Sequence, residues 1–282
     1  MKLIADSGSS KTDWRFLKED KTIEQLKTSG INPYLISEKE LFEDLKADFK
    51  YLALQEIKEI VFYGAGCSQP KNKEKIKSVF KDFFKCDRVF VQDDMLAAAR
   101  ASCGIEEGIV CILGTGANAC HYNGEKTTER MISLGYAIGD EGSGAYIGKL
   151  AIKAFLENEM PRNLVGKFNT AFPQLNLENA LQQIYQKPYP NRFFAQFFQF
   201  ALMYQKEKFF FELISDGFQL FLEKSVLKFK QHQNLPIHFV GGVAFHANSI
   251  MRMVLTKNSL TAGNFMESPI AGLTLYHKNQ HS

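Results

Sequence analysis

MKLIADSGSSKTDW, residues 1–14, is the stretch that decides the fold of this chain. Its short apolar run ends at Asp6, the chain turns through glycine and serines, and apolar residues resume at Trp14. This pattern predicts a strand, a tight turn and a second strand, with a carboxylate at the mouth of the turn. Backbone N–H groups and hydroxyls of such a turn can approach a phosphate, and the carboxylate can hold a hydrated Mg2+. Taken alone, however, the stretch fits a polar hairpin without a ligand better than a phosphate site.

The same motif occurs again after residue 108. An apolar run at 109–113 is followed by the turn GTGAN at 114–118 and by a further strand at 119–122. Before it, helices alternate with strands after an initial three-strand meander, so the fold class is α/β with mixed sheets. We therefore expect two similar domains, 1–106 and 107–282, each with a phosphate-binding turn facing a nucleotide between them. The last helix, within 270–282, is a candidate to pack back on the first domain.

Composition excludes several classes of protein. The 282 residues are 45% hydrophobic and 23% charged, as in ordinary globular chains. The net charge of +3 arises from interleaved basic and acidic residues, so no basic stripe indicates nucleic acid. Five cysteines without a C-x-x-C pair argue against a disulfide framework and a structural zinc site. The first apolar run is too short for a signal peptide, and no segment approaches the ~18 apolar residues of a membrane span, so we expect a cytoplasmic protein.

Acidic residues stand beside the glycine-rich turns. These residues are Asp6, the pair Asp93 and Asp94, and Asp140 with Glu141. No Walker A pattern occurs, and the second hairpin lacks the third glycine of a dinucleotide-binding fingerprint. Phosphoryl transfer from ATP to an alcohol needs an acidic group for Mg2+ and another for the hydroxyl proton. A single such carboxylate could be solvated or cap a helix, as Asp94 could for the helix after it. Three such acidic sites, each beside a glycine turn, favour a phosphoryl-transfer site.

Four segments then occur in one order: DSGSSKT at 6–12, GTGAN at 114–118, GYAIGDEGSG at 135–144 and VGGV at 240–243. With them the chain resembles the BadF/BadG/BcrA/BcrD ATPase family of the sugar kinase/Hsp70/actin superfamily, and within it the N-acetylglucosamine kinases. The resemblance covers nearly the whole chain and is weakest over 160–232. It implies two ribonuclease H-like (actin-like ATPase) domains with an ATP cleft between them. The implied activity is ATP-dependent phosphorylation of the C6 hydroxyl of an N-acetylhexosamine, foremost N-acetylglucosamine.

The resemblance also implies roles for individual residues. Asp6 matches the aspartate that organises Mg2+, and Asp94 matches the base that takes the proton of the sugar C6 hydroxyl. Positions that match ATP contacts are Ser9, Ser10, Lys11, Thr12, Thr115, Gly116, Asn118, Gly241 and Gly242. Positions that match amino-sugar contacts are Asn32, Ser68, Asp94 and Asp140. The chain has Asp93-Asp94 where the sugar kinases usually have Asn-Asp, so the assignment of the base is open by one residue.

Two other functions stay open. One is an ATP-driven activator of a dehydratase or reductase, in which cysteines such as Cys103, Cys111 and Cys120 would hold an iron–sulfur cluster between two subunits. The other is a non-catalytic sensor of ATP or a sugar. The sequence also leaves open whether the sugar is N-acetylglucosamine or N-acetylmuramic acid. Exposed sheet edges and the phenylalanine-rich helices favour a homodimer.

Phenylalanines are concentrated between residues 193 and 221. The set comprises Phe193, Phe194, Phe197, Phe198, Phe200, Phe209, Phe210, Phe211, Phe218 and Phe221. The segment 143–232 is expected to be mostly helical, so we predict that these rings form the packing core between helices and bind no cofactor.

Overall fold

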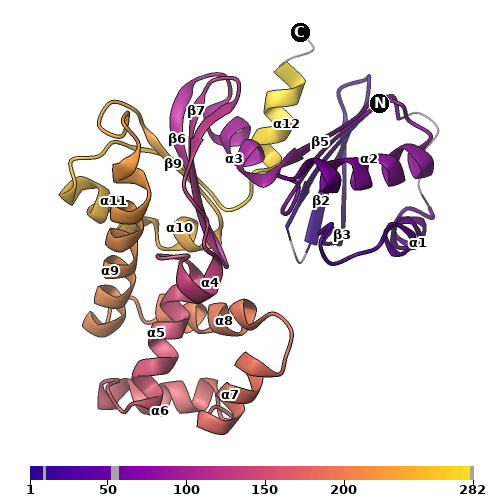
Figure 1. The fold of residues 1–282 in the computed structure, drawn as a ribbon. Coiled ribbons are helices and arrows are strands. Elements are labelled where there is room, and N and C mark those ends of the chain that lie inside the picture. Colours follow the sequence, from indigo (N-terminus) through magenta and orange to yellow (C-terminus); the bar gives the residue numbers. More distant parts are fainter. Residues whose placement is uncertain (9–10, 52–56, 280–282) are drawn as a thin grey trace. The chain divides into compact units, whose positions relative to one another are not determined.

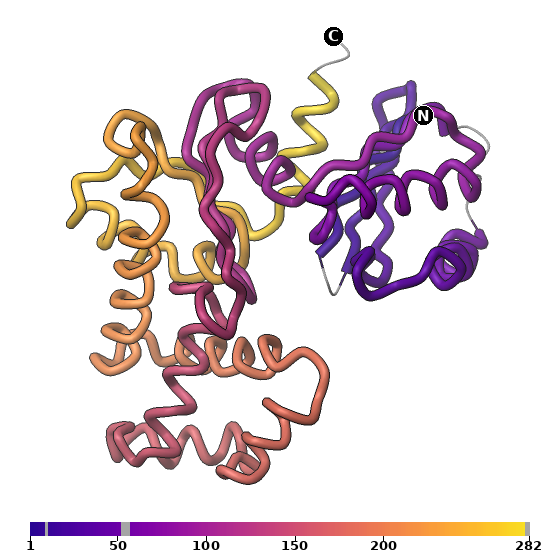
Figure 2. The backbone as a smooth tube through the Cα atoms, in the orientation of Figure 1, coloured from indigo at the N-terminus to yellow at the C-terminus, as the bar shows by residue number. Residues whose placement is uncertain are grey.

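The computed structural model describes residues 1–8, 11–51 and 57–279. The predicted phosphate contacts Ser9 and Ser10 therefore lie outside the described residues. The chain forms two compact units. Figures 1 and 2 colour the chain by residue number, from indigo at the N-terminus to yellow at the C-terminus. Unit 1 consists of Met1–Ile105 with Pro269–Ser282, and unit 2 is Glu106–Ser268. The C-terminal helix thus belongs to unit 1, so unit 2 is shorter than the 107–282 expected from the sequence.

Unit 1 is built on a five-stranded mixed sheet with the order β3-β2-β1-β4-β5. Its strands are β1 (Lys2–Ser7), β2 (Lys11–Leu17), β3 (Ile23–Ser29), β4 (Glu59–Gly64) and β5 (Val89–Asp93). The first three strands form an antiparallel meander, whereas β1, β4 and β5 run parallel. Its other helices are α1 (Glu38–Asp48), α2 (Pro70–Phe84) and α3 (Asp94–Cys103). This is the β-β-β-α-β-α-β-α order expected from the sequence.

The core of unit 1 lies between one face of the sheet and helices α1 and α2. Trp14 on β2 is fully buried, and its ring meets that of Phe49, just after α1, at 5.1 Å and that of Phe80 on α2 at 5.9 Å. Every second residue of a strand points to this face of the sheet, where the helices cover it. The core fixes β1 and therefore the position of Asp6 on that strand.

Helix α12 (Ile270–Asn279) packs against α3 and the opposite face of the same sheet. Gly272 permits a close approach, because a β-carbon there would overlap the backbone of Ala101 on α3. The Tyr63 hydroxyl hydrogen-bonds to His277 Nε2 at 2.8 Å and accepts a hydrogen bond from Arg100 at 2.9 Å. Packing and this buried polar network therefore both tie the end of the described chain to unit 1.

Unit 2 repeats the sheet of unit 1. Its order is β10-β9-β6-β7-β8, with strands β6 (Glu107–Leu113), β7 (Ala117–Asn123), β8 (Thr127–Arg130), β9 (Ile237–Val240) and β10 (Ala262–Met266). Again three strands form an antiparallel meander and three run parallel. The expected α/β class with two mixed sheets is confirmed. Strands β8 and β10 were not expected, since TTER and AGNFM carry no apolar alternation.

Helices make up the rest of unit 2. They are α4 (Gly135–Ile138), α5 (Gly144–Leu156), α6 (Arg162–Ala171), α7 (Leu177–Tyr185), α8 (Pro190–Met203), α9 (Lys208–Lys224), the 3-10 helix η1 (Val226–Lys228), α10 (Gly242–His246) and α11 (Asn248–Lys257). The sequence predicts one helix over about 243–255, but the structure divides it at Ala247 into α10 and α11. Most of the phenylalanines of α8 and α9 are buried, which confirms their predicted role as core. Among the described residues, no helix combines the length and hydropathy that a membrane crossing requires.

Candidate active site

The turn after β1 brings two aspartates together. Asp6 on β1 pairs in register with Asp13 on β2, directly across the antiparallel ladder. Asp13 is buried, and its carboxylate forms ion pairs with Lys11 at 3.4 Å and Lys27 at 3.8 Å. Like charges opposite each other in a sheet are unfavourable, so this pair needs cations nearby. Lys11 itself is largely exposed, as a residue that could meet a phosphate must be.

The carboxyl of Asp6 has an unusual protonation equilibrium. Burial and, to a smaller extent, the negative charges of Asp13 and Asp94 raise the pKa of Asp6 to about 7, whereas Lys11 opposes this rise. The structure thus brings Asp6 and Asp94 close enough to interact electrostatically, although 87 residues separate them in the chain. A carboxyl strongly perturbed by burial and by neighbouring carboxylates is a candidate functional group.

Other groups around this turn have structural roles. The buried Thr12 hydroxyl hydrogen-bonds to the Ser7 hydroxyl at 2.8 Å and donates to the Ser29 carbonyl at 2.9 Å. Ser7 Oγ in turn accepts a hydrogen bond from the Ile31 backbone N–H at 2.8 Å. The predicted phosphate contact Thr12 therefore holds the base of the hairpin through its side chain. Ser7 and Ile31 fix where the chain leaves β3.

The two aspartates after β5 are distinguished by their positions. Asp93 is the N-cap of α3, and its side chain accepts a hydrogen bond from the Leu96 backbone N–H at 3.0 Å. Asp94 is the first residue of the helix and interacts electrostatically with Asp6 and Cys67. The sequence-based alternative that Asp94 caps the helix is therefore wrong. The apolar residues of the sequence predict a strand over 88–91, whereas β5 extends two residues beyond Val91 and includes Asp93.

The predicted sugar contacts of unit 1 lie on adjacent loops. Asn32 follows β3, and its side-chain oxygen accepts a hydrogen bond from the Tyr34 N–H at 3.0 Å. A β-carbon at Gly66, where φ is +81°, would lie 2.9 Å from that same oxygen, so only glycine lets the two loops approach this closely. Ser68, two residues further on, is exposed. Asn32 and the 64–68 loop therefore form one edge beside the end of β4.

In unit 2, the second turn is held against the start of a helix. The Gly144 N–H donates to the Gly114 carbonyl at 2.8 Å, and the Ala145 N–H donates to the Thr115 carbonyl at 3.2 Å. Ser143 caps α5 by accepting a hydrogen bond from the Tyr146 N–H at 3.1 Å. Segments about 30 residues apart in the chain thus form one structure, as expected of a site made from separate turns.

Asp140 supports the same turn. It is buried, its φ is +58°, and it accepts a backbone hydrogen bond from Ala117. Burial raises the pKa of Asp140, and this hydrogen bond opposes that rise. A β-carbon at Gly116 would lie 3.0 Å from a carboxylate oxygen of Asp140, so the predicted contact Gly116 is packed on it. Asn118 Oδ1 accepts a hydrogen bond from the Ala119 N–H at 2.9 Å.

The third glycine segment of unit 2 reaches the same place from the C-terminal side. Gly241 follows β9 with φ of +115°, and a β-carbon there would overlap the Leu113 carbonyl at the start of the second turn. Its N–H donates to the Met266 carbonyl at 2.8 Å. Gly242 then begins α10. The predicted phosphate and adenosine positions of unit 2 are therefore neighbours.

Sequence reasoning missed two residues that shape these sites. Asp13 is the cross-strand partner of Asp6, and Ser143 caps the helix that supports the second turn. The alternation of β2 could have indicated Asp13, because pairing the two strands through a tight turn places it opposite Asp6. Ser143 lies three residues before an aromatic in the first turn of a helix, a pattern too common to stand out.

The donor set of unit 1 fits Mg2+. Among the described residues, no group of three or more His, Cys, Asp or Glu side chains is arranged to hold a metal ion. Mg2+, however, commonly takes one or two carboxylates, several waters and the phosphates of its substrate. A cation beside Asp6 would offset the repulsion from Asp13 and Asp94 that raises its pKa. Asp6 is therefore suited to an ion that arrives with a nucleotide.

The cysteines are less suited to metal chemistry. All five are free and buried. Burial raises the pKa of Cys67 to about 12 and that of Cys103 to about 11, and it raises the pKa of Cys111 as well. Metal ligands must be thiolates, so these surroundings oppose cluster binding. The donor chemistry thus does not favour the iron–sulfur alternative.

Together, the duplicated mixed sheet and the paired hairpin turns define an actin-like ATPase fold. In fold alone, the chain is similar to a ROK family glucokinase from Streptomyces griseus solved with glucose and AMPPNP. That comparison has a TM-score of 0.56 and 13% identity and covers 99% of this chain and 98% of the other.

Within this class the chain belongs to the BadF/BadG/BcrA/BcrD ATPase family, whose sequence profile matches residues 5–273. It is 39% identical to a Porphyromonas gingivalis protein, provisionally assigned as an N-acetylglucosamine kinase, with a TM-score of 0.94 and 100% of each chain covered. It is also 33% identical over 106 residues to the N-acetylmuramic acid/N-acetylglucosamine kinase of Clostridium acetobutylicum. That match covers 38% of this chain and 35% of the relative, so it spans about a third of the relative's length.

Proposed function

We propose that this protein is an ATP-dependent kinase that phosphorylates the C6 hydroxyl of N-acetylglucosamine. The observation that carries the proposal is the division of roles between Asp93 and Asp94. Asp93 caps α3, while Asp94 is turned to the electrostatic group that includes Asp6. The names of the similar proteins from P. gingivalis and C. acetobutylicum support the amino sugar as substrate.

In this proposal Asp94 acts as the general base. A carboxylate that accepts the proton of the C6 hydroxyl raises the nucleophilicity of that oxygen as it approaches the γ-phosphorus of ATP. The negative charge of Asp94 contributes to the raised pKa of Asp6, so the proposed base and the proposed metal ligand interact with each other. Asn32 and Ser68, on neighbouring loops of unit 1, hold the sugar so that its C6 hydroxyl meets Asp94.

Phosphate binding falls to both turns. Lys11 in unit 1 supplies a positive charge, and the backbone N–H groups of the Thr115-Gly116 turn with the Asn118 amide supply neutral donors. Gly241 and Gly242 leave room for the adenosine. Asp6 would hold Mg2+, which neutralises charge on the β- and γ-phosphates when bound. Asp140 keeps the second turn in place, and its predicted contact with the sugar stays a prediction.

The decisive test compares Asp94→Asn with Asp93→Asn. Asp94→Asn should lower sugar-dependent ADP release by about 10²–10⁴-fold, because the base is lost, while ATP binding stays within about twofold. Asp93→Asn is the matched control, since asparagine caps a helix about as well as aspartate. Its turnover and melting temperature should stay close to those of the wild type. Wild-type turnover in Asp94→Asn would overturn the proposed base.

The substrate is tested with the same assay. N-acetylglucosamine, N-acetylmuramic acid and glucose are offered at equal concentration with ATP and Mg2+. We expect the highest kcat/KM for N-acetylglucosamine. Bound ATP without sugar-stimulated turnover, for every sugar offered, would contradict the kinase function. The proposed partners are thus the amino sugar and ATP, both available in the cytoplasm.

A further inference from the structure

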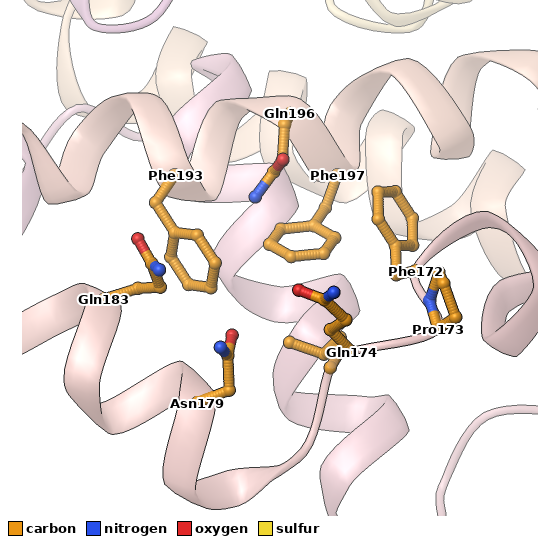
Figure 3. A pocket seen from close by; sticks show the side chains of 9 residues that line it. Phe172, Pro173, Gln174, Asn179, Gln183, Phe193, Gln196 and Phe197 are labelled. Atoms are coloured by element: carbon orange, nitrogen blue, oxygen red, sulfur yellow. The ribbon is translucent and has the colours of Figure 1, made fainter.

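A pocket in unit 2 takes no part in the proposed reaction. It has a volume of about 330 Å³ and lies where α7, α8 and the loop between α6 and α7 meet. Figure 3 shows its side chains: aromatic rings form one wall, and amide groups from the loop, α7 and α8 surround the space in front of it. None of its lining residues belongs to the glycine turns described above.

The aromatic wall is held rigidly. Phe197 is buried, and its ring contacts that of Phe193 at 5.2 Å and that of Phe172 at 4.6 Å. Phe193 and Phe172 are only partly buried, so they keep surface toward the pocket. The rings of Phe193 and Phe172 are inclined to that of Phe197 by 87° and 58°, so the wall offers an angled apolar surface whose position is set by the core of unit 2. A ligand that packs on it loses little of its binding free energy to ordering the protein.

Four carboxamides make up the polar part of the pocket: Gln174, Asn179, Gln183 and Gln196. Asn179 and Gln183 lie one turn apart on α7, so both point to the same side of that helix (Figure 3). Each carboxamide offers two N–H donors and an acceptor oxygen. No residue that lines the pocket carries a charge. The pocket thus matches a ligand whose groups both donate and accept hydrogen bonds, and it has no cation to hold a phosphate or carboxylate.

We infer that this pocket is a second carbohydrate site, which binds one ring of a neutral sugar. The C–H groups on one face of a pyranose can pack against the aromatic wall. Its hydroxyl or acetamide groups can form hydrogen bonds with the carboxamides. A volume of about 330 Å³ holds on the order of ten waters, which suits one ring better than a peptide segment. The absence of charge in the lining makes the pocket selective for an unphosphorylated sugar over its phosphate ester.

The test observes the side-chain amides of the pocket by NMR in the intact, 15N-labelled protein. The probes are methyl β-glucoside, methyl N-acetyl-β-glucosaminide and glucose 6-phosphate. We expect at least one neutral glycoside to shift the four pocket amides with a dissociation constant in the millimolar range. Glucose 6-phosphate should bind at least tenfold more weakly. Because the signals are assigned residue by residue, sugar bound at the proposed catalytic residues is distinguished from sugar in this pocket.

Two neighbouring residues of α7 supply the variant and its control. Gln183→Glu keeps the shape of the side chain but replaces donors with a charge, and it should weaken glycoside binding at least tenfold. Gln182→Glu makes the same change on an exposed position outside the pocket and should leave binding within twofold. Phe193→Leu keeps apolar volume but removes the flat ring, so it should also weaken binding. Sugar kinase turnover should be unchanged in Gln183→Glu.

Several outcomes would overturn the inference. The pocket amides could stay unmoved by both glycosides, or shift as strongly in Gln183→Glu as in the wild type. Equal or tighter binding of glucose 6-phosphate would contradict the expected selectivity for neutral sugars. A proline-rich peptide that shifts the amides when no glycoside does would make the pocket a peptide site instead. Loss of turnover in Gln183→Glu but not in Gln182→Glu would show that the pocket is not separate from the catalytic machinery.

Discussion

The hairpin β1–β2 of unit 1 and the hairpin β6–β7 of unit 2 occupy equivalent places in their sheets but carry different chemistry. In both, the glycine after the first strand donates its N–H across the turn at 3.0 Å, from Gly8 to Lys11 and from Gly114 to Gly116. In each hairpin, the second residue pair counted from the turn differs between the units. In unit 1 this pair is Asp6 opposite Asp13, whereas in unit 2 it is Ile112 opposite Asn118. Equivalent positions of the two hairpins thus carry two carboxylates in unit 1 and none in unit 2.

The comparison indicates that the two copies of a duplicated fold can specialise in different ligands. The charged hairpin suits a cation, and it retains that ability at a cost in stability, which the raised pKa of Asp6 records. The neutral hairpin offers N–H groups and an amide, which suit an anion. The charged hairpin would bind an anion poorly, and the neutral hairpin would bind a cation poorly.

The largest effect is expected for Asp6→Asn. Turnover should fall by about 10²–10³-fold, because the carboxylate proposed to hold Mg2+ with the nucleotide is lost. The same variant should be more stable than the wild type without ligands. Between pH 4 and 7 the folded wild type binds a proton at Asp6 that the unfolded chain has released, so its free energy of unfolding falls as pH rises through this window. The gain of the variant should grow from near zero at pH 4 to at most about 4 kcal/mol above pH 7.

Urea unfolding between pH 4 and 8 measures this gain. Asp82→Asn is the control, since Asp82 is an exposed acid of α2 in the same unit. A pH dependence of stability that is identical in wild type and Asp6→Asn would show that Asp6 does not titrate near neutral pH. Unchanged turnover would remove Asp6 from the proposed metal site.

The next effect compares two glycines at equivalent positions. Gly64 is the last residue of β4 and pairs with Ser7 at the end of β1. Gly241 directly follows β9, whose last residue, Val240, pairs with Ile112 near the end of β6. Gly241→Ala should cost about 2–4 kcal/mol, because φ is +115° and the new β-carbon meets the Leu113 backbone. Gly64→Ala should cost less, since its β-carbon meets the Phe62 ring at 2.5 Å, and a ring can shift. Thermal melting of both variants measures the difference, and equal losses would show that the positive φ of Gly241 and its contact with the Leu113 backbone add no cost.

The smallest effect tests the neutral hairpin. Asn118→Asp gives unit 2 a carboxylate at the position that matches Asp13 of unit 1. ATP binding should weaken about tenfold, because a negative charge then faces the phosphates. The fold should be unaffected, since a carboxylate oxygen can still accept the Ala119 N–H. Calorimetric titration with ATP measures the change, and Asn123→Asp at the other end of β7 is the control. Equal affinity in Asn118→Asp and wild type would place the phosphates elsewhere.

Much of the fold could be predicted from local patterns. The turns after Asp6 and Leu113 stand between apolar runs, so both hairpins were visible in the sequence. Strand β8 was not, because TTER is polar on both sides and forms only as the third strand of a meander. Strand β10 contains glycine and asparagine and an irregularity in its pairing with β9, so its local preference gives no signal.

The candidate site was only partly visible, for a related reason. The glycine segments could be located individually, but the contacts of Gly144 with Gly114 and of Gly241 with Leu113 depend on tertiary packing. To tell which of Asp93 and Asp94 caps α3, the first residue of that helix must be known. Hydrophobic periodicity does not locate a helix start to one residue. The pocket beside Phe193 was hidden, since its residues were expected to serve only as core.

Helix α12 has a consequence for the order in which the protein assembles. The hydrogen bond between Tyr63 and His277 joins residues 214 positions apart, while unit 2 is continuous in sequence. On the ribosome, unit 2 can therefore finish folding while unit 1 still exposes the α3 surface that α12 will cover. Closing a loop of that length carries an entropic penalty before any contact offsets it. Unit 1, translated first, is thus the unit that completes last, and it is the one a chaperone would have to shield.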